Sequence, residues 1–216
     1  MQRIHRYLLL VVVLGATSIP VLADTIGYTI AVDTSSAAGQ TGYIGFDLST
    51  GRILPILPVT AVVSGYAGGA LIPGDPFADA NTVNVSGSLP GVVTMDNSAA
   101  NAFTERILFG NSVSFFVTLS GTGVDLLGGA TSATATDFQL GFFDLDGNPL
   151  FTTDPLGNVA VIDVAPNGVV TAEALSNGSG GSDATIAETP EPTSLAMFAC
   201  AGMLALAWRV RRRRLG

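Results

Sequence analysis

The sequence is poor in the residue types that most often carry out chemistry. It contains no lysine, and its only histidine, His5, and only cysteine, Cys200, lie near opposite ends of the chain. Without a histidine or lysine base, the central residues cannot form Ser-His-Asp or Ser-Lys catalytic groups. Without cysteine they form no disulfide, thiolate nucleophile or Cys/His metal site. We therefore expect a non-enzymatic central domain that needs no cofactor and is stabilised by packing alone.

Positive charge is also scarce in the central part of the chain. Between Asp24 and Thr189, Arg52 and Arg106 are the only basic side chains against sixteen Asp and Glu residues, a formal charge of −14. A domain with this charge repels nucleic acid and anionic lipid surfaces. We therefore expect no nucleic-acid partner, and the low pI is typical of an extracellular domain kept soluble by self-repulsion.

Residues 1–23 have the three parts of a secretory signal peptide. Arg3 and Arg6 precede the apolar run "YLLLVVVLGA", and small residues at Val21 and Ala23 follow. This pattern predicts cleavage between Ala23 and Asp24 by signal peptidase after export through the Sec machinery. The alternative is a retained membrane anchor, but the run is short against the roughly 20 residues that a span needs.

The C-terminal residues predict a single membrane helix. Residues 193–208, "TSLAMFACAGMLALAW", carry no charge and would cover about 24 Å as a helix, close to the thickness of a hydrocarbon core. The arginines that follow, which predict a cytoplasmic membrane stop, are Arg209, Arg211, Arg212, Arg213 and Arg214. A buried core helix is the alternative, although a globular core would not accommodate this arginine block.

The triplet Pro190, Glu191 and Pro192 directly precedes this apolar run. In that order, the triplet, the apolar helix and the arginines at residues 190–216 resemble the PEP-CTERM sorting signal. The resemblance implies processing by an exosortase, a membrane cysteine peptidase, in a Gram-negative-type bacterial envelope, often in organisms that make exopolysaccharide. It also implies a protein held in the membrane by its C-terminus in transit and then delivered to the cell surface or extracellular matrix. The alternative is a proline helix stop before a permanent anchor.

Residues 24–175 indicate an all-β domain, an antiparallel β-sandwich of the jelly-roll or Ig-like kind. Runs rich in Val, Ile, Thr and Phe are separated by Gly, Pro, Asn and Asp clusters. The nine expected strands lie within residues 25–34, 42–49, 59–67, 81–89, 91–98, 112–121, 137–146, 158–166 and 168–175. Residues 176–189 are rich in Gly and Ser, which predicts a flexible linker that lifts the domain off the membrane.

Turn residues predict how the strands connect. Asp146-Gly147 and Asn167-Gly168 favour tight turns, so we expect consecutive strands to be antiparallel neighbours. The stretch "NSAANAFTERIL", residues 97–108, is the one place in the domain that admits a short helix.

Four stretches of the domain are similar to parts of a group of small, uncharacterised PEP-CTERM proteins. They are "DTSSAAGQTGYIGFDLS", "SGSLPGVVTMDNS", "FGNSVSFFVTLSG" and "FTTDPLGNVAVIDVAPNGVVT". No activity is assigned to that group, so the similarity implies a location and no mechanism.

Two acidic patterns leave other functions open. Asp144, Asp146 and Asn148 alternate around a glycine, as in a Ca²⁺ loop, but the spacing departs from the EF-hand pattern and a hairpin turn explains it better. Two carboxylates could serve a glycosidase, yet the domain lacks the tryptophans that often line sugar clefts. The leading expectation is an exported envelope or extracellular-matrix protein, and the alternative is a polysaccharide- or calcium-binding surface module.

Overall fold

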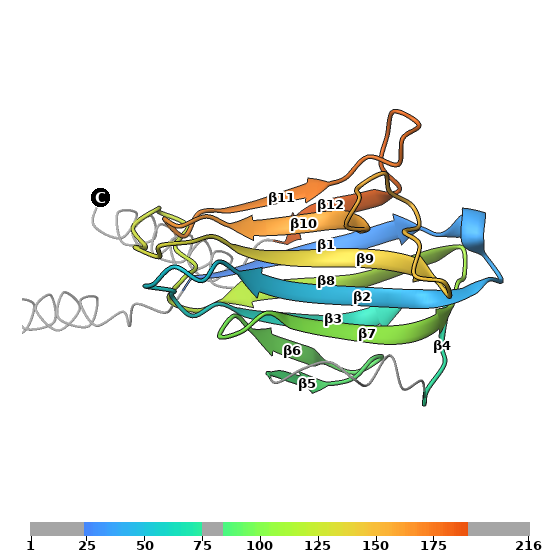
Figure 1. The fold of residues 1–216 in the computed structure, drawn as a ribbon, viewed down its shortest axis with the longest axis horizontal. Coiled ribbons are helices and arrows are strands. Elements are labelled where there is room, and N and C mark those ends of the chain that lie inside the picture. The colour runs from blue at the N-terminus through green and yellow to red at the C-terminus, as the bar shows by residue number, and fades with distance from the viewer. Residues whose placement is uncertain (1–23, 75–83, 190–216) are drawn as a thin grey trace, which may run out of the picture.

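The computed structural model describes residues 24–74 and 84–189, which form two antiparallel β-sheets packed face to face (Figure 1). The first sheet consists, in spatial order, of β12 (Ala184–Thr189), β1 (Thr25–Asp33), β8 (Ser112–Ser120), β3 (Thr60–Ala67), β6 (Val93–Asp96) and β5 (Val85–Gly87). The second consists of β11 (Val170–Ala174), β10 (Asn158–Val164), β9 (Thr136–Asp144), β2 (Thr41–Thr50), β7 (Asn101–Leu108) and β4 (Ala70–Leu71). The 3₁₀ helix η1 (Ser35–Ala37) lies between β1 and β2. The expected all-β sandwich is confirmed.

The core lies between the two sheets because alternate residues of each strand point inward. In β1, Ile26, Tyr28, Ile30 and Val32 are buried, and β8 alternates in the same way. At the centre, the ring of Phe46 from the second sheet lies 5.2 Å from that of Phe115 in the first, measured between centroids and edge to face. Burial of these apolar faces is the main force that holds the sheets together.

Strand pairing is nested along the chain. β1 pairs with β8, β2 with β7 and β3 with β6, while β1, β2 and β3 alternate between the two sheets. Among the described residues, consecutive strands pair only as β5–β6, β9–β10 and β10–β11. The expectation of consecutive neighbours is therefore wrong for most of the fold. The connection of residues 51–59 is long enough to cross between sheets about 10 Å apart, which a two-residue turn could not do.

Both predicted turns are confirmed. Gly147 has φ 83° and its N–H donates to the carbonyl of Asp144, while Gly168 has φ 87° and its N–H donates to the carbonyl of Ala165. Only glycine adopts such φ values without strain, so these positions fix where the chain reverses. Each of the nine expected ranges overlaps one strand of the structure, although residues 75–83 lie outside the described part.

The stretch that admitted a short helix is strand β7. Phe103 and Ile107 are buried there, and their spacing of four residues fits one face of a helix and one face of a strand equally well. Pairing with β2 decides between the two, because it stacks Phe103 on Phe46 with ring centroids 5.8 Å apart. The helix prediction is therefore wrong.

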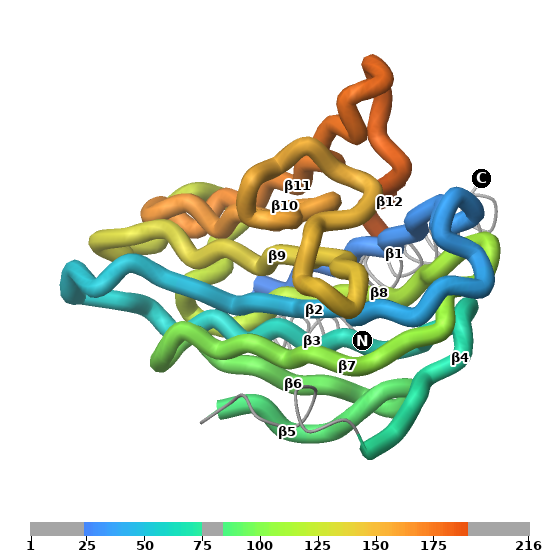
Figure 2. Tube along the Cα trace, turned by 45° about the vertical axis from the view of Figure 1, so that its right-hand side comes forward, coloured from blue at the N-terminus to red at the C-terminus, as the bar shows by residue number. Residues whose placement is uncertain are grey.

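The predicted linker also contains a strand. Residues 184–189 form β12, which pairs with β1 from Val32↔Ala184 to Gly27↔Thr189 and buries Ala184. The domain therefore extends to Thr189, and the boundary expected at residue 175 is corrected. Composition indicated a linker because residues 176–183 are Gly- and Ser-rich. These residues lie in the loop between β11 and β12, which stands clear of the sandwich in Figure 2.

The two ends of the sandwich differ in which chain segments lie there. We call the end where β1 begins and β12 ends the proximal end, and the opposite end the distal end (Figure 1). The β2–β3 loop (residues 51–59) and the β8–β9 loop (residues 121–135) are proximal, while η1 and residues 145–157 and 175–183 are distal. The expected signal peptide, membrane helix and sorting motif lie outside the described residues. Within residues 24–74 and 84–189, no helix has the length and apolar character to cross a membrane.

Candidate functional site

The two predicted processing junctions adjoin neighbouring strands. Asp24, the first residue after the predicted signal cleavage, directly precedes β1, and Thr189, the residue before Pro190, ends β12 opposite Gly27. Asp24 is held in place, because its Oδ2 accepts a hydrogen bond of 2.8 Å from the backbone N–H of Leu126. Ala23, Pro190, Glu191, Pro192 and the C-terminal arginines themselves lie outside the described residues. The chain therefore enters and leaves the domain at the same end.

The contact between Gly27 and Thr189 fixes the end of β12. Any side chain at position 27 would collide with the Thr189 hydroxyl, so glycine lets the last residue of β12 lie against β1. In the described structure β12 pairs only with β1 and forms an edge of the first sheet. Its end is consequently held by backbone pairing on one side alone.

Asp144 and Asp146, considered above as calcium ligands, lie in the distal turn after β9. Asp144 Oδ1 accepts hydrogen bonds from the N–H groups of Asp146 and Asn148, at 2.9 and 2.8 Å, and Oδ2 accepts one from Asn148 Nδ2 at 2.8 Å. These bonds, that from the Asn148 side chain first, lower the pKa of Asp144. The carboxylate thus stabilises its own turn, as the hairpin interpretation predicts.

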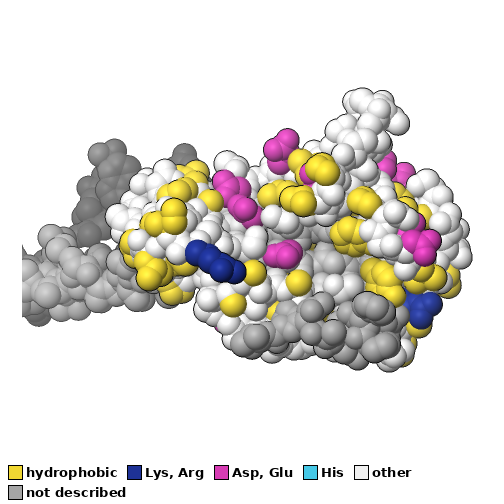
Figure 3. All heavy atoms as spheres, in the orientation of Figure 1, with side chains coloured by type: hydrophobic (Ala, Val, Ile, Leu, Met, Phe, Trp, Pro, Cys, Tyr) yellow, Lys and Arg dark blue, Asp and Glu magenta, His cyan; other side chains and the backbone are white. Residues whose placement is uncertain are grey.

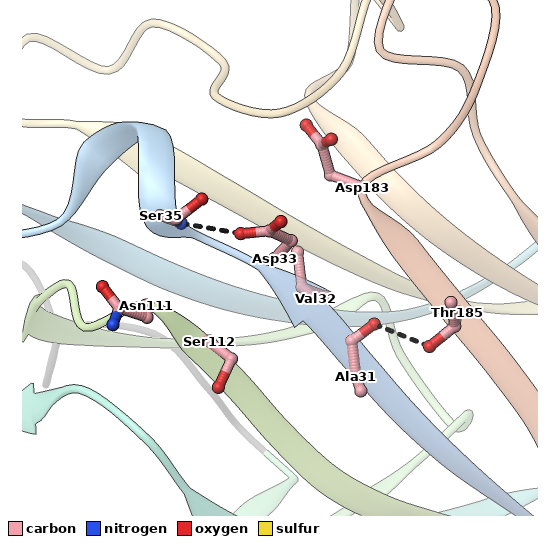
Figure 4. A pocket seen from close by; sticks show the side chains of 8 residues that line it. All are labelled: Ala31, Val32, Asp33, Ser35, Asn111, Ser112, Asp183 and Thr185. Atoms are coloured by element: carbon pink, nitrogen blue, oxygen red, sulfur yellow. Dashed lines mark hydrogen bonds between the residues drawn. The ribbon is translucent and has the colours of Figure 1, made fainter.

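A shallow groove lies at the distal end, between β12, β1 and β8 (Figure 4). Its lining residues are Ala31, Val32, Asp33, Ser35, Asn111, Ser112, Asp183 and Thr185. Asp33 reaches toward Ser35, whose N–H donates to it at 2.9 Å. Hydrogen bonding from the Ser35 side chain, and then from this N–H, lowers the pKa of Asp33. Asp183 accepts from Asn177 Nδ2 at 2.8 Å. Both carboxylates already have donors within the domain, and the groove offers hydroxyl and amide groups rather than a catalytic pair.

A row of three aspartates crosses the outer face of the second sheet. Asp137 on β9 is directly opposite Asp163 on β10, and Asp47 lies diagonally across on β2. Burial, then a hydrogen bond to Asp163, then the charges of Asp163 and Asp47 raise the pKa of Asp137 to about 6. Burial also raises the pKa of Asp47. Asp137 is therefore protonated at mildly acidic pH, and it faces Asp163 in a pair that the sequence did not single out.

This aspartate row borders a small groove on the same face. Its lining residues are Gly45, Phe46, Asp47, Ala102, Phe103, Thr104, Gln139, Gly141, Phe143, Leu156 and Asn158. The half-buried ring of Phe143 covers Gly141 and Gly157, where side chains would collide with it. The described residues contain no group of three or more His, Cys, Asp or Glu side chains arranged to hold a metal ion. The face thus combines an aromatic ring, an amide and carboxylates.

The comparisons with known proteins return no match. No family model fits the chain, and no curated protein or solved structure is similar to it. Function is therefore inferred from the residues and the geometry of this chain.

Proposed function

We propose that this chain is an exported, non-enzymatic protein of the cell envelope or extracellular matrix, anchored by its C-terminus and then processed there by an exosortase. The observation that carries the proposal is the pairing of Gly27 with Thr189, which brings the chain's entry and exit to one end of the domain. A protein that carries a signal peptide and a C-terminal membrane helix is attached to one membrane twice before processing. With both attachments at one end, the domain can fold on the exported side before either is cut.

The fold supports a role in display rather than catalysis. The nested pairs β1–β8, β2–β7 and β3–β6, divided between two sheets, correspond to a jelly roll, to which β9, β10, β11 and β12 add further strands. Its exported residues, 24–189, contain no His, Lys or Cys. The carboxylates of Asp33, Asp144 and Asp183 already accept hydrogen bonds within the domain.

The test compares three versions of the protein in a host that has the matching sorting enzyme. The full chain is expected to lose residues 1–23 and its C-terminal segment, as measured by intact mass, and to reach the surface or medium. A chain that ends at Thr189 retains β12, and is expected to leave the membrane without C-terminal processing. A chain with Pro190, Glu191 and Pro192 replaced by Ala is expected to remain in the membrane at the unprocessed C-terminal mass. An unaltered full chain that keeps its C-terminal segment, or the same C-terminal processing and location for the full chain and the alanine version, would contradict the proposal.

A second function, contact with polysaccharide, is favoured by the groove beside Phe143. An aromatic ring packs against sugar C–H groups, while the nearby Gln139 amide and Asp47 carboxylate offer hydrogen bonds to hydroxyls. We expect Gln139→Ala to weaken binding of the host's exopolysaccharide at least tenfold in isothermal titration, while Thr171→Ala, on the exposed part of β11, leaves it unchanged. Absence of binding by the unaltered protein would eliminate this function. Calcium is not proposed as a ligand, because the Asp144 oxygens are already used within the turn.

A further inference from the structure

Large apolar side chains project into solvent from the two main loops of the proximal end. Ile53 and Leu54 in the β2–β3 loop are 68% and 78% exposed, and Leu126 and Leu127 in the β8–β9 loop are 41% and 96% exposed. Arg52 lies next to the first pair and is also exposed. Figure 3 shows hydrophobic side chains gathered at this end of the molecule with a basic side chain beside them, while acidic side chains lie over the middle and toward the distal end. Such a cluster marks an interaction surface.

Hydrogen bonds hold these loops in position. Leu126 donates its N–H to Asp24, and the N–H groups of Leu127 and Gly129 donate to the two oxygens of Asp125, at 3.0 and 2.9 Å. The two loops are also joined to each other, since the N–H of Ala133 donates to the carbonyl of Pro55 at 2.6 Å. The apolar tips are thus presented by ordered backbone, and the two acidic side chains nearest Leu126 and Leu127 are occupied by backbone donors.

The position of β12 brings this surface close to the membrane. Four Cα steps separate Thr189, the last residue of β12, from Thr193, where the predicted membrane helix begins. These steps span at most about 15 Å in any conformation. Since β12 ends at the proximal end, Thr189 cannot lie farther than that from the start of the predicted membrane helix, and the proximal end is the part of the sandwich nearest to the bilayer while the tail is inserted.

We propose that the proximal end is a membrane contact surface, in which Ile53, Leu54, Leu126 and Leu127 enter the interfacial layer of the bilayer and Arg52 binds lipid phosphate. This inference rests on the proposed C-terminal anchor. Apolar side chains and arginine are both favoured at this depth of a bilayer. The formal charge of −14 between Asp24 and Thr189 disfavours strongly anionic lipid, so the occupant is a bilayer rich in zwitterionic phospholipid. The domain would sit upright, with its distal groove facing away from the membrane.

The experiment uses single-cysteine versions of the full chain, which is straightforward because Cys200 is the only native cysteine. Leu127→Cys and, at the distal end, Ser179→Cys are each made with Cys200→Ala and labelled with an environment-sensitive fluorophore. Both positions are exposed, so neither label disturbs the core. The proteins are reconstituted in phosphatidylcholine vesicles with and without lipid that carries a quencher near the headgroup. Quenching of the label at position 127 is expected to be at least threefold greater than at position 179.

Flotation of the same vesicles separates this inference from the proposed function. Protein that floats with the vesicles but shows equal quenching at the two positions overturns the membrane contact and leaves the anchor intact. Equal quenching together with cross-linking between copies at position 127 would assign the surface to self-association and also overturn the inference. Protein that does not float overturns the anchor, and the contact surface with it.

Discussion

At the scale of single residues, Asp137 is in an environment that opposes its own charge. It is half-buried on the outer face of the second sheet, opposite Asp163 and near Asp47, and its pKa is raised to about 6. In the unfolded chain its pKa returns to near 3.9. Protonated Asp137 therefore contributes stability below about pH 4, and this contribution is lost as the pH rises through 6.

Replacing Asp137 by Asn should stabilise the domain at neutral pH and leave it unchanged in acid. The amide keeps a hydrogen-bond donor toward Asp163 and removes the charge that becomes costly between about pH 4 and pH 6. Solvent reduces the cost of this charge because Asp137 is only half-buried. We therefore expect the free energy of unfolding to rise by about 1 kcal/mol at pH 8, which raises the melting temperature by about 2–4 °C. Asp146→Asn, in the exposed distal turn, makes the same change in net charge and serves as the control. If the melting temperatures of the two variants rise equally, or if that of D137N is still raised at pH 3.5, the aspartate row is not the cause.

Residue roles that arise within a few positions of the chain could be predicted from the sequence, and those that arise from pairing could not. Asp144 bonds to groups two and four residues away, so its turn role is visible in "DLDGN". Asp137 and Asp163 are brought together only by the register of β9 and β10, and Asp47 only by that of β2 and β9. The register in which these strands pair cannot be read from the residues near either aspartate in the sequence.

At the scale of elements, the end of β12 depends on the absence of a side chain at Gly27. We expect Gly27→Val to loosen the last residues of β12, although valine favours strands, because its Cβ would collide with the Thr189 hydroxyl. Hydrogen exchange of the backbone amides in residues 184–189 should become at least tenfold faster. Thr29→Val, two residues along the same face of β1 and opposite Ala187, should leave it unchanged.

A second substitution tests whether this collision is the cause. Thr189→Ala removes the hydroxyl that a valine at position 27 would meet, so the double variant should recover most of the amide protection that G27V loses. If the double variant exchanges as fast as G27V alone, the loosening comes from another contact of position 27.

Elements with strict alternation and flanking turn residues were predictable, whereas those formed by pairing to an existing edge were not. β1 and β8 show their inward residues plainly in the sequence. β4 has only two residues and exists because β7 offers partners to it. β12 combines one buried residue, Ala184, with backbone bonds to β1, and neither is marked by composition.

At the scale of the whole molecule, the order of strands determines which segments lie at the end where the chain enters and leaves the domain. The sequence predicted the all-β sandwich, but the nested pairing of β1 with β8 and the docking of β12 on β1 are long-range choices. They place the start of β1, the end of β12, and the apolar β2–β3 and β8–β9 loops at one end. The last six residues of the expected linker, 184–189, form β12 instead, which would shorten the proposed tether to the membrane.

Lengthening that tether should release the proximal end from the bilayer. Insertion of twelve Gly and Ser residues between Thr189 and Pro190 adds a flexible chain with a root-mean-square span of about 19 Å. This span exceeds the distance of about 15 Å that the chain between Thr189 and Thr193 can now cover. The readout is trypsin, because Arg52 and Arg106 are the only basic residues between Asp24 and Thr189, and Arg106 lies within β7 between β2 and β4. Cleavage after Arg52 in proteoliposomes should become at least fivefold faster.

The same insertion between Gly180 and Gly181 is the matched control. It adds equal length and composition to the distal loop that stands clear of the sandwich, where it should leave the cleavage rate at Arg52 unchanged. Both variants keep the predicted anchor, so they should float with vesicles alike. Only the first insertion alters the distance between β12 and the bilayer. A difference between the two variants in the cleavage rate at Arg52 therefore measures how far the short tether holds Arg52 and its apolar neighbours against the lipid. Equal cleavage rates would mean that tether length does not position this end.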